Sequence, residues 1–169
     1  MSNQRHVAQV LAVFIAFGCV AQFACAQTVA GRVIRVSDGD TLTIQDVHQR
    51  VYRVRLDEID APELGQAFGK RSRESLAEMC SDKTAYVVTK GADRYGRTLG
   101  RVRCAGVDAN SEQVRRGMAW VFDRYVRSNS PLYALQWEAQ AIRRGLWSDP
   151  QPTAPWRWRK TPKRDAERT

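Results

Sequence analysis

Four carboxylates lie within seven residues of a chain that is strongly basic overall. Asp57, Glu58, Asp60 and Glu63 belong to the segment RLDEIDAPEL, whereas the full chain of 169 residues has a formal net charge of +9 at pH 7. Like charges at this spacing repel one another, so positive charge is expected close by. The candidates are nearby arginines or a metal ion; for side chains that face solvent, water is sufficient.

Histidine-based catalysis is disfavoured by the residues available. The chain has two histidines, His6 near the N-terminus and His48 in an expected hairpin turn, where a solvated side chain is the simpler interpretation. Ser-His-Asp and Cys-His nucleophile systems therefore lack their parts. A hydrolase with this sequence would have to use carboxylates, arginines and a metal ion.

Carboxylates in loops are the candidate metal ligands. Asp38 and Asp40 lie in the turn DGDT, and Asp60 and Glu63 lie in the acidic segment. Hard carboxylate oxygens, supplemented by backbone carbonyls, suit Ca²⁺ or Mg²⁺. The DGDT turn lacks the spacing of an EF-hand loop. Each acid pair taken singly is equally well a turn former or a carboxylate at a helix start, so only the whole set argues for a site.

Five strands are expected to position these loops, because apolar and polar residues alternate over Ala30–Val36, Thr41–Gln45, Val51–Leu56, Thr84–Lys90 and Thr98–Cys104. In the third strand Tyr52, Val54 and Leu56 share one face. If that face meets the core, Arg55 points away from it. Turns over 37–40 and 46–49 join the first three strands.

Three helices complete the expected fold. The first covers Gly65–Cys80, and the second is a short helix capped by Asn110 that runs through Arg116. In the third, Ser130 is the N-cap, Gly145 lies just past the end, and an apolar stripe is formed by Leu132, Leu135, Ala139 and Ile142. Strands and helices in this proportion indicate a small α+β domain, consistent with a closed barrel.

The N-terminus has the pattern of an export signal. A basic start is followed by the apolar run Val10–Val20, too short to span a bilayer, and by Ala24-Cys25-Ala26. We expect cleavage after Ala26. A buried helix is disfavoured because no face is polar, and a lipoprotein signal is a weaker alternative because Cys19 and Cys25 lack a good lipobox. The mature protein is then exported, secreted or periplasmic, with no membrane segment.

The mature chain divides into a domain over 27–149 and a tail over 150–169 that is rich in Pro, Trp and Arg. It keeps 26 basic and 18 acidic side chains, and this net +8 favours a polyanionic partner, although charge alone does not exclude a role in solubility. Trp156 and Trp158 could dock on the domain or stack on bases. The residues after Lys160 are expected to be disordered.

Two cysteines remain after the expected processing. An even pair in an oxidising compartment suggests a disulfide between Cys80 and Cys104. Closing a loop of this length is worth about 3 kcal/mol in the chain-entropy model. Two buried free thiols are the alternative. A zinc site is disfavoured because the chain has no CxxC pair and the mature part has one histidine.

The chemically interesting motifs occur in one order along the chain: DGDT at 38–41, VRL at 54–56, IDAPE at 59–63, DRYGR at 93–97 and a GxAW segment within Asn110–Trp120, with Gly145–Trp147 as a further matching run. Each motif is weak alone, but the ordered set at this spacing is specific. It resembles the staphylococcal (micrococcal) nuclease family, from about Val33 to about Trp147. The resemblance implies an OB-fold, a five-stranded Greek-key β-barrel with about three helices.

The resemblance implies roles for individual residues. Asp40 and Asp60 match calcium-ligating carboxylates, and Ala61 matches a residue that contributes its backbone carbonyl, where other members can have threonine. Asp38 matches an aspartate near the metal. Glu63 matches a glutamate to which the role of general base toward water is given.

The substrate side of the expected site is carried over in the same way. Arg55 and Arg97 match two arginines that grip the scissile phosphate, and Tyr95 and Tyr125 match tyrosines near the nucleotide. Asp123 departs from the family pattern, since a tyrosine of the nucleotide pocket aligns with it. An acid there would repel phosphate, so the pocket or the alignment differs locally.

With the export signal, the resemblance implies a secreted, Ca²⁺-dependent, monomeric endonuclease that cuts DNA and RNA and leaves 3′-phosphate ends. Two alternatives remain: a noncatalytic OB-fold protein that binds single-stranded nucleic acid, and an exported protein whose acids hold calcium for stability only. Such binding modules usually lose the acids and arginines that this chain keeps. Turnover separates the enzyme from both alternatives.

Overall fold

The computed structural model describes residues 27–161. The expected export signal over residues 1–26 and the last eight residues of the tail lie outside the described residues. Between Gln27 and Thr161 no helix is long and apolar enough to cross a membrane. The described residues cover the domain expected over 27–149 and the first part of the tail.

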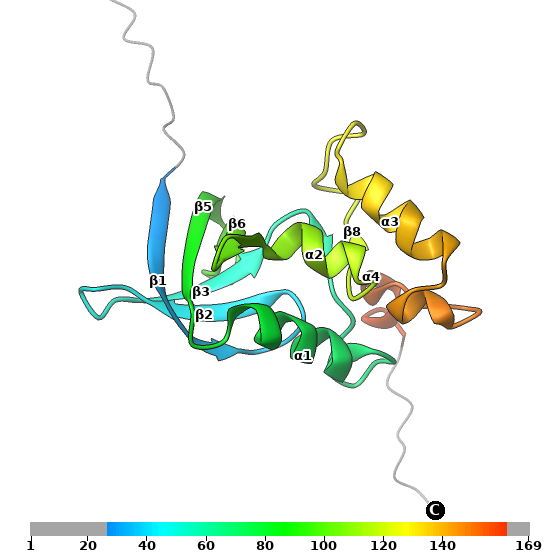
Figure 1. Cartoon of the computed structure of the whole chain (residues 1–169), viewed down its shortest axis with the longest axis horizontal. Helices are drawn as coiled ribbons and strands as arrows, with labels where there is room; N and C mark the ends of the chain where they lie inside the picture. The colour runs from blue at the N-terminus through cyan, green and yellow to red at the C-terminus, as the bar shows by residue number, and fades with distance from the viewer. Residues whose placement is uncertain (1–26, 162–169) are drawn as a thin grey trace, which may run out of the picture.

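Five strands close into a barrel, with short strand pairs beside it (Figure 1). Their bounds are β1 Thr28–Val36, β2 Thr41–Gln45, β3 Val51–Leu56, β4 Ile59–Asp60, β5 Thr84–Ala92, β6 Thr98–Cys104, β7 Val107–Asp108 and β8 Trp120–Val121. Neighbours run in the order β3-β2-β1-β5-β6-β7, and a parallel pairing of β3 with β6 closes the ring. This is the predicted five-stranded OB-fold barrel, and all five predicted strands are present.

Alternation along the strands builds the interior of the barrel. Val54 and Leu56 are fully buried, and they pack with inward residues of the neighbouring strands such as Leu42, Ile44 and Val87. Arg55 lies between the two buried residues of β3 and points to the other face, as predicted. The same alternation that fills the core therefore presents Arg55 outside the barrel.

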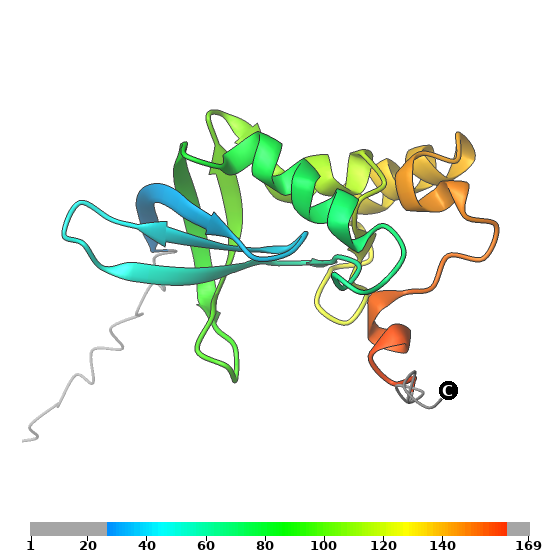
Figure 2. The ribbon, with the colours of Figure 1, turned by 90° about the horizontal axis from the view of Figure 1, so that it is seen from below.

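The helices gather on one side of the barrel and beyond its end (Figures 1 and 2). They are α1 Gly69–Cys80, α2 Ala109–Arg115, α3 Leu132–Ala141, the 3₁₀ helix η1 Gly145–Ser148 and α4 Pro155–Trp158. Helix α1 begins four residues later than predicted, because the chain turns over 64–68 and Phe68 has a positive φ of 65°. The added helices η1 and α4 come from segments without a helical repeat.

Three details of the predicted helix caps and faces are wrong. The N-cap of α3 is Pro131 rather than Ser130, although the Ser130 hydroxyl accepts the N–H of Leu132 at 3.3 Å. The N-cap of α2 is Asp108, whose carboxylate accepts the backbone N–H of Ser111 at 2.9 Å. Asn110 is buried instead, and its amide bonds the backbone of Val102 and Asp57. The predicted stripe on α3 also ends early, since Ile142 lies past the helix and is 58% exposed.

The predicted disulfide is present. Cys80, the last residue of α1, is bonded to Cys104, the last residue of β6, and their Cα atoms lie 5.2 Å apart. Both cysteines are fully buried in the main core. The bond therefore fixes the C-terminal end of α1 to the barrel.

Two glycines allow the last part of the domain to pack closely. A Cβ on Gly117 would lie 2.2 Å from the carbonyl oxygen of Arg144, and one on Gly145 would lie 2.3 Å from that of Gly117. Both glycines have positive φ angles. Their close approach brings the Trp147 ring to 4.3 Å from that of Trp120, in a second small core.

Candidate active site

Two aspartates from separate loops meet on one arginine. Arg55 of β3 places Nη1 2.5 Å from Oδ2 of Asp40 and Nη2 3.0 Å from Oδ1 of Asp60. Asp40 ends the β1–β2 turn, and Asp60 belongs to β4. All three side chains are largely buried. The structure thus brings together three of the residues that the sequence indicated.

Backbone pairing fixes this arrangement. Thr41 lies opposite Arg55 in the β2–β3 ladder, and the carbonyl of Asp40 accepts the N–H of Leu56 at 2.8 Å. The Asp40 carboxylate in turn accepts the N–H of Ala61 at 3.0 Å. The sheet therefore sets the spacing between the two acidic loops before any ligand is present.

Helices α1 and α2 hold the acidic turn from behind. The buried amide of Gln113 donates to the carbonyls of Gly39, at 2.7 Å, and Ser72, at 3.0 Å. A Cβ on Gly39 would lie 1.8 Å from the Ser72 hydroxyl, so only glycine fits there. Sequence reasoning missed Ser72 and Gln113. Their only sequence indication is a polar residue on the inner face of a helix.

Burial and charge act in opposite directions on the acids. Burial disfavours the charged form of Asp40, but the charge and hydrogen bonds of Arg55 outweigh it, so the pKa of Asp40 lies below its ordinary value. The pKa of Asp60 is raised. Burial and the charge of Asp40 raise it by more than the hydrogen bonds and charges of Arg159 and Arg55 lower it. Burial and Asp40 raise the pKa of Asp38 to about 6.

Glu63 reaches the same site through a residue that sequence reasoning missed. Its Oε1 lies 2.7 Å from Nη1 of Arg159, whose Nη2 lies 2.6 Å from Oδ2 of Asp60. Arg159 follows α4 in the tail and is 96 residues away from Glu63. Nothing local in the sequence could have indicated this contact.

Arg97 immediately precedes β6 and has an ion-pair partner of its own. In the parallel β3–β6 pair Arg55 is opposite Leu99. Strand alternation, if continued from Leu99 back past the start of β6, would place Arg97 on the face of Arg55. The Nε of Arg97 lies 2.7 Å from Oδ2 of Asp93 in the same loop. Within residues 27–161 no ion pair joins Arg97 to Asp40 or to the other site carboxylates.

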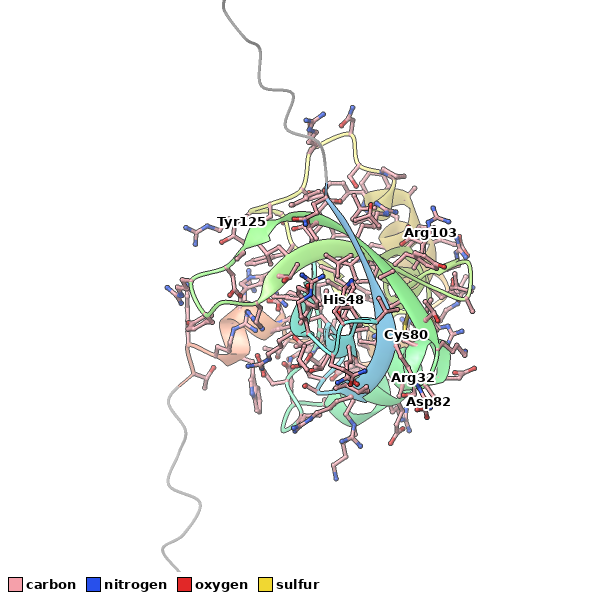
Figure 3. The ribbon with its side chains drawn as sticks, turned by 90° about the vertical axis from the view of Figure 1, so that its left-hand side faces the viewer. Arg32, His48, Cys80, Asp82, Arg103 and Tyr125 are labelled. Atoms are coloured by element: carbon pink, nitrogen blue, oxygen red, sulfur yellow. A yellow bond between two sulfur atoms is a disulfide. The ribbon has the colours of Figure 1, made fainter. Side chains whose placement is uncertain are left out.

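The two predicted nucleotide tyrosines are exposed. Tyr95 is 67% exposed, and the guanidiniums of Arg94 and Arg97 lie 4.8 and 5.7 Å from its ring centre. Tyr125, labelled in Figure 3, is 61% exposed. Its ring packs edge-on against that of Phe122, with ring centres 5.1 Å apart. Rings accessible in this way can stack on bases, and their assignment stays a prediction.

The unusual Asp123 is paired with a residue of α3. Its carboxylate accepts the hydroxyl of Tyr133 at 2.8 Å, a bond that, with burial and the nearby charge, raises the pKa of Tyr133. The acid is therefore engaged by a neutral donor on α3. This contact gives a structural reason for an acid at a position where the family pattern has tyrosine.

The two remaining acids of the opening cluster form a separate pair of contacts. Lys90 on β5 places Nζ 2.6 Å from carboxylate oxygens of both Asp57 and Glu58. The candidates for the whole acidic segment were arginines, a metal ion or water. The partner is instead a lysine, and both side chains are mostly buried. The cluster thus splits into a lysine-bound half and an arginine-bound half.

His48 is placed where it cannot take part in this site. It lies in the exposed β2–β3 turn, at the end of the molecule that faces the viewer in Figure 3, whereas α4 lies toward the other end in Figures 1 and 2. Its N–H donates to Asp46 within the turn. This agrees with the solvated side chain expected from the sequence.

The donor set fits a hard cation in its chemistry. Asp40 and Asp60 each direct an oxygen at one guanidinium, and Asp60 and Glu63 share a second. Within residues 27–161 no three His, Cys, Asp or Glu side chains gather closely enough to hold a metal unaided. Ca²⁺ takes about six to eight oxygens, so backbone carbonyls such as that of Ala61, with water, would complete its shell.

Comparisons with known proteins identify the family of the chain. A family model described as "Staphylococcal nuclease homologue" matches residues 53–149. The chain is 41% identical over 143 residues to "Micrococcal nuclease" of Shigella flexneri, covering 79% of this chain and 82% of that one. It is 44% identical over 133 residues to an "Uncharacterized endonuclease" of Haemophilus influenzae, covering 78% and 74%. The "Protein ParB" of Escherichia coli is 42% identical over 140 residues, covering 77% and 78%. The chain therefore belongs to the staphylococcal nuclease family.

Proposed function

We propose that the protein is an exported, Ca²⁺-dependent endonuclease that hydrolyses DNA and RNA and leaves 3′-phosphate ends. Its family makes it a nuclease with nucleic acid as substrate. The calcium, the product ends, the export and a monomeric state are the finer parts of the proposal. The observation that carries it is the convergence of Asp40 and Asp60 on Arg55 next to Glu63.

The arginines serve the phosphate in this scheme. A phosphodiester is anionic, so attacking water meets repulsion unless positive charge offsets it. Strand alternation would place Arg55 and Arg97 on one face of the β3–β6 pair, and planar guanidiniums donate paired hydrogen bonds to phosphate oxygens. Their charge stabilises the additional negative charge of the transition state. Tyr95 and Tyr125 would hold the adjoining bases by stacking.

The acids serve the cation and the water. Asp40, Asp60 and the carbonyl of Ala61 would hold Ca²⁺, which supplies a Lewis acid that polarises a phosphoryl oxygen. Glu63 carries a carboxylate that is 43% exposed at the rim, accessible to a water molecule. From there it orients that water and accepts its proton.

The test is cleavage by the purified protein. Supercoiled plasmid and a structured RNA are incubated in Ca²⁺ or in EGTA, with Glu63→Gln as the variant that keeps shape and removes the base. We expect rapid cleavage in Ca²⁺ alone, with a large loss in Glu63→Gln. Cleavage in EGTA at the same rate would contradict the calcium dependence, and equal rates in the variant would contradict the role of Glu63.

The product ends and the class of activity need separate readouts. Fragments with 3′-phosphates block primer extension until a phosphatase removes them, so extension without that treatment would refute this part. Binding of single strands without turnover, and with unchanged affinity in Glu63→Gln, would instead indicate the noncatalytic OB-fold protein. Calcium-dependent melting with neither turnover nor binding would indicate a structural calcium site.

A further inference from the structure

The tail places a guanidinium directly on the proposed metal site. Arg159 engages both oxygens of Asp60, with Nη2 at 2.6 Å from Oδ2 and Nη1 at 3.3 Å from Oδ1, and its Nη1 also lies 2.7 Å from Glu63. Two carboxylates that the proposed mechanism needs are therefore held by one side chain. The proposed mechanism does not use Arg159.

The segment that carries Arg159 is anchored to the domain, so the contact is built into the fold. The ring of Trp156 stacks on Phe122, with centres 5.3 Å apart and planes 19° apart, and its edge meets Trp120 at 5.7 Å. Gln66 donates its side-chain amide to the carbonyl of Thr153. Ala154 and Pro155 are buried. The tail thus docks through Trp156, which decides between the two possibilities left open for that residue.

A count of charges shows what Arg159 replaces. Ionised Asp40, Asp60 and Glu63 carry three negative charges, and the buried Arg55 neutralises one of them. The remaining two are what one divalent cation balances. Arg159 takes one of these charges. Its shortest contacts are to Oδ2 of Asp60 and Oε1 of Glu63, whereas the Asp60 oxygen that Arg55 binds is Oδ1.

We propose that Arg159 is an internal counterion that competes with the divalent cation, so that the docked tail restrains metal binding at the active site. Cation binding displaces the guanidinium, and by reciprocity the guanidinium weakens cation binding by the same free energy. The inference rests on the proposed function, because it requires these carboxylates to bind a divalent cation. The restraint is electrostatic and local.

Calorimetric titration of the metal-free protein with Ca²⁺ tests the competition. Arg159→Ala should bind Ca²⁺ roughly two- to fivefold more tightly than the unaltered protein, the upper part of the range for a partly exposed ion pair. Arg159→Lys keeps the charge but loses the fork of donors, so its affinity should lie between the two. Arg157→Ala, an exposed arginine on the same helix, is the matched control and should change affinity little.

Equal affinities in Arg159→Ala and the unaltered protein would overturn the competition and leave the metal site standing. An equal gain in Arg157→Ala would also overturn it, since the effect would then be one of overall charge. If neither protein binds Ca²⁺, the metal part of the proposed function fails and the competition fails with it. The three outcomes are distinct in one set of titrations.

A second measurement follows the guanidinium itself. In ¹⁵N NMR spectra of the metal-free protein, slowly exchanging Nη protons of Arg159 should be visible and should be absent from Arg159→Ala. Saturating Ca²⁺ should remove or shift them, because the ion pair is broken. Signals that persist unchanged at saturating Ca²⁺ would contradict displacement even if the affinities differ.

Discussion

The two arginines proposed for the phosphate are held in opposite ways. Arg55 is bound by carboxylates from two separate segments, the β1–β2 turn and β4, and both carboxylates are buried. Arg97 is bound by Asp93, four residues earlier in the same loop, beside the exposed Tyr95. Arg55 is therefore held by contacts between separate segments, whereas Arg97 is held by a contact within its own loop.

This difference separates stability from function. Removal of Arg55 leaves buried carboxylates of two separate segments without their partner. Removal of Arg97 breaks one ion pair within a single loop, where backbone N–H groups still bond Asp93. Arg55 should therefore contribute to both folding and catalysis, and Arg97 mainly to catalysis. The variants below test this division, ranked by their expected effect on the free energy of unfolding.

Arg55→Ala should have the largest effect. It leaves Asp40 without its main partner and removes one from Asp60, and an uncompensated buried charge costs about 3 kcal/mol or more. Activity should be lost as well. Urea unfolding and plasmid cleavage measure both effects. Arg53→Ala, an exposed arginine on the same strand, is the control and should change stability by less than about 0.5 kcal/mol. Unaltered stability in Arg55→Ala would remove the distinction between the arginines.

Gly39→Ala should have the second-largest effect on the free energy of unfolding. The new methyl group collides with Ser72 on α1, and overpacking of this kind costs about 1–3 kcal/mol. Because the turn carries Asp40, Ca²⁺ affinity should fall together with stability. Gly65→Ala is the matched control, since no atom lies within 4 Å of its added Cβ and its φ is not positive. Equal stability of the two variants would show that the acidic turn is not fixed by α1.

Features that depend on neighbours along the chain were predictable from the sequence. Contacts between separate segments, such as those that hold Arg55, were predictable only in part. Strand alternation predicted β3 and the outward direction of Arg55, and the even cysteine pair predicted the disulfide. These features depend on neighbours along the chain or on composition. The site residues themselves came from a resemblance, and their chemical roles stay predictions.

What failed depended on contacts between distant segments. Asn110 has the chemistry of a helix cap, but the backbone of Val102 and Asp57 competes for its amide and binds it in the core. Gln113 and Arg159 likewise act on residues 41 to 99 positions away. No periodicity or local motif encodes such pairs, because their geometry exists only after the barrel has closed.

Arg97→Ala should separate activity from stability. Loss of one cationic donor to the developing charge should lower the cleavage rate roughly 10²- to 10³-fold. The free energy of unfolding should change less than in Arg55→Ala, because only a pair within one loop is broken and the backbone N–H groups of Tyr95 and Arg97 still bond Asp93. Arg94→Ala in the same loop is the control and should lose far less activity. A loss of stability as large as that of Arg55→Ala would contradict the conclusion that Arg97 is held only within its own loop.

Asp93→Asn tests the same loop through its pH dependence and should have the smallest effect. Burial disfavours the charge of Asp93, but the N–H groups of Arg97 and Tyr95 and the Arg97 guanidinium outweigh it, so the pKa of Asp93 lies below 3.8. The unfolded chain then binds the proton more readily, and this contribution to stability is present above pH 3.8 and is lost as the pH falls through the folded-state pKa.

The expected difference between the unaltered protein and Asp93→Asn is under about 1 kcal/mol at pH 6, and it should shrink between pH 4 and pH 2.5. Unfolding curves across this range measure it, with Asp82→Asn, which breaks a largely exposed pair with Arg32, as the background. A difference that stays constant down to pH 2.5 would mean that the Asp93 carboxylate does not hold the loop. In that case Arg97 would owe its position to the β3–β6 pairing, and both arginines would depend on the barrel.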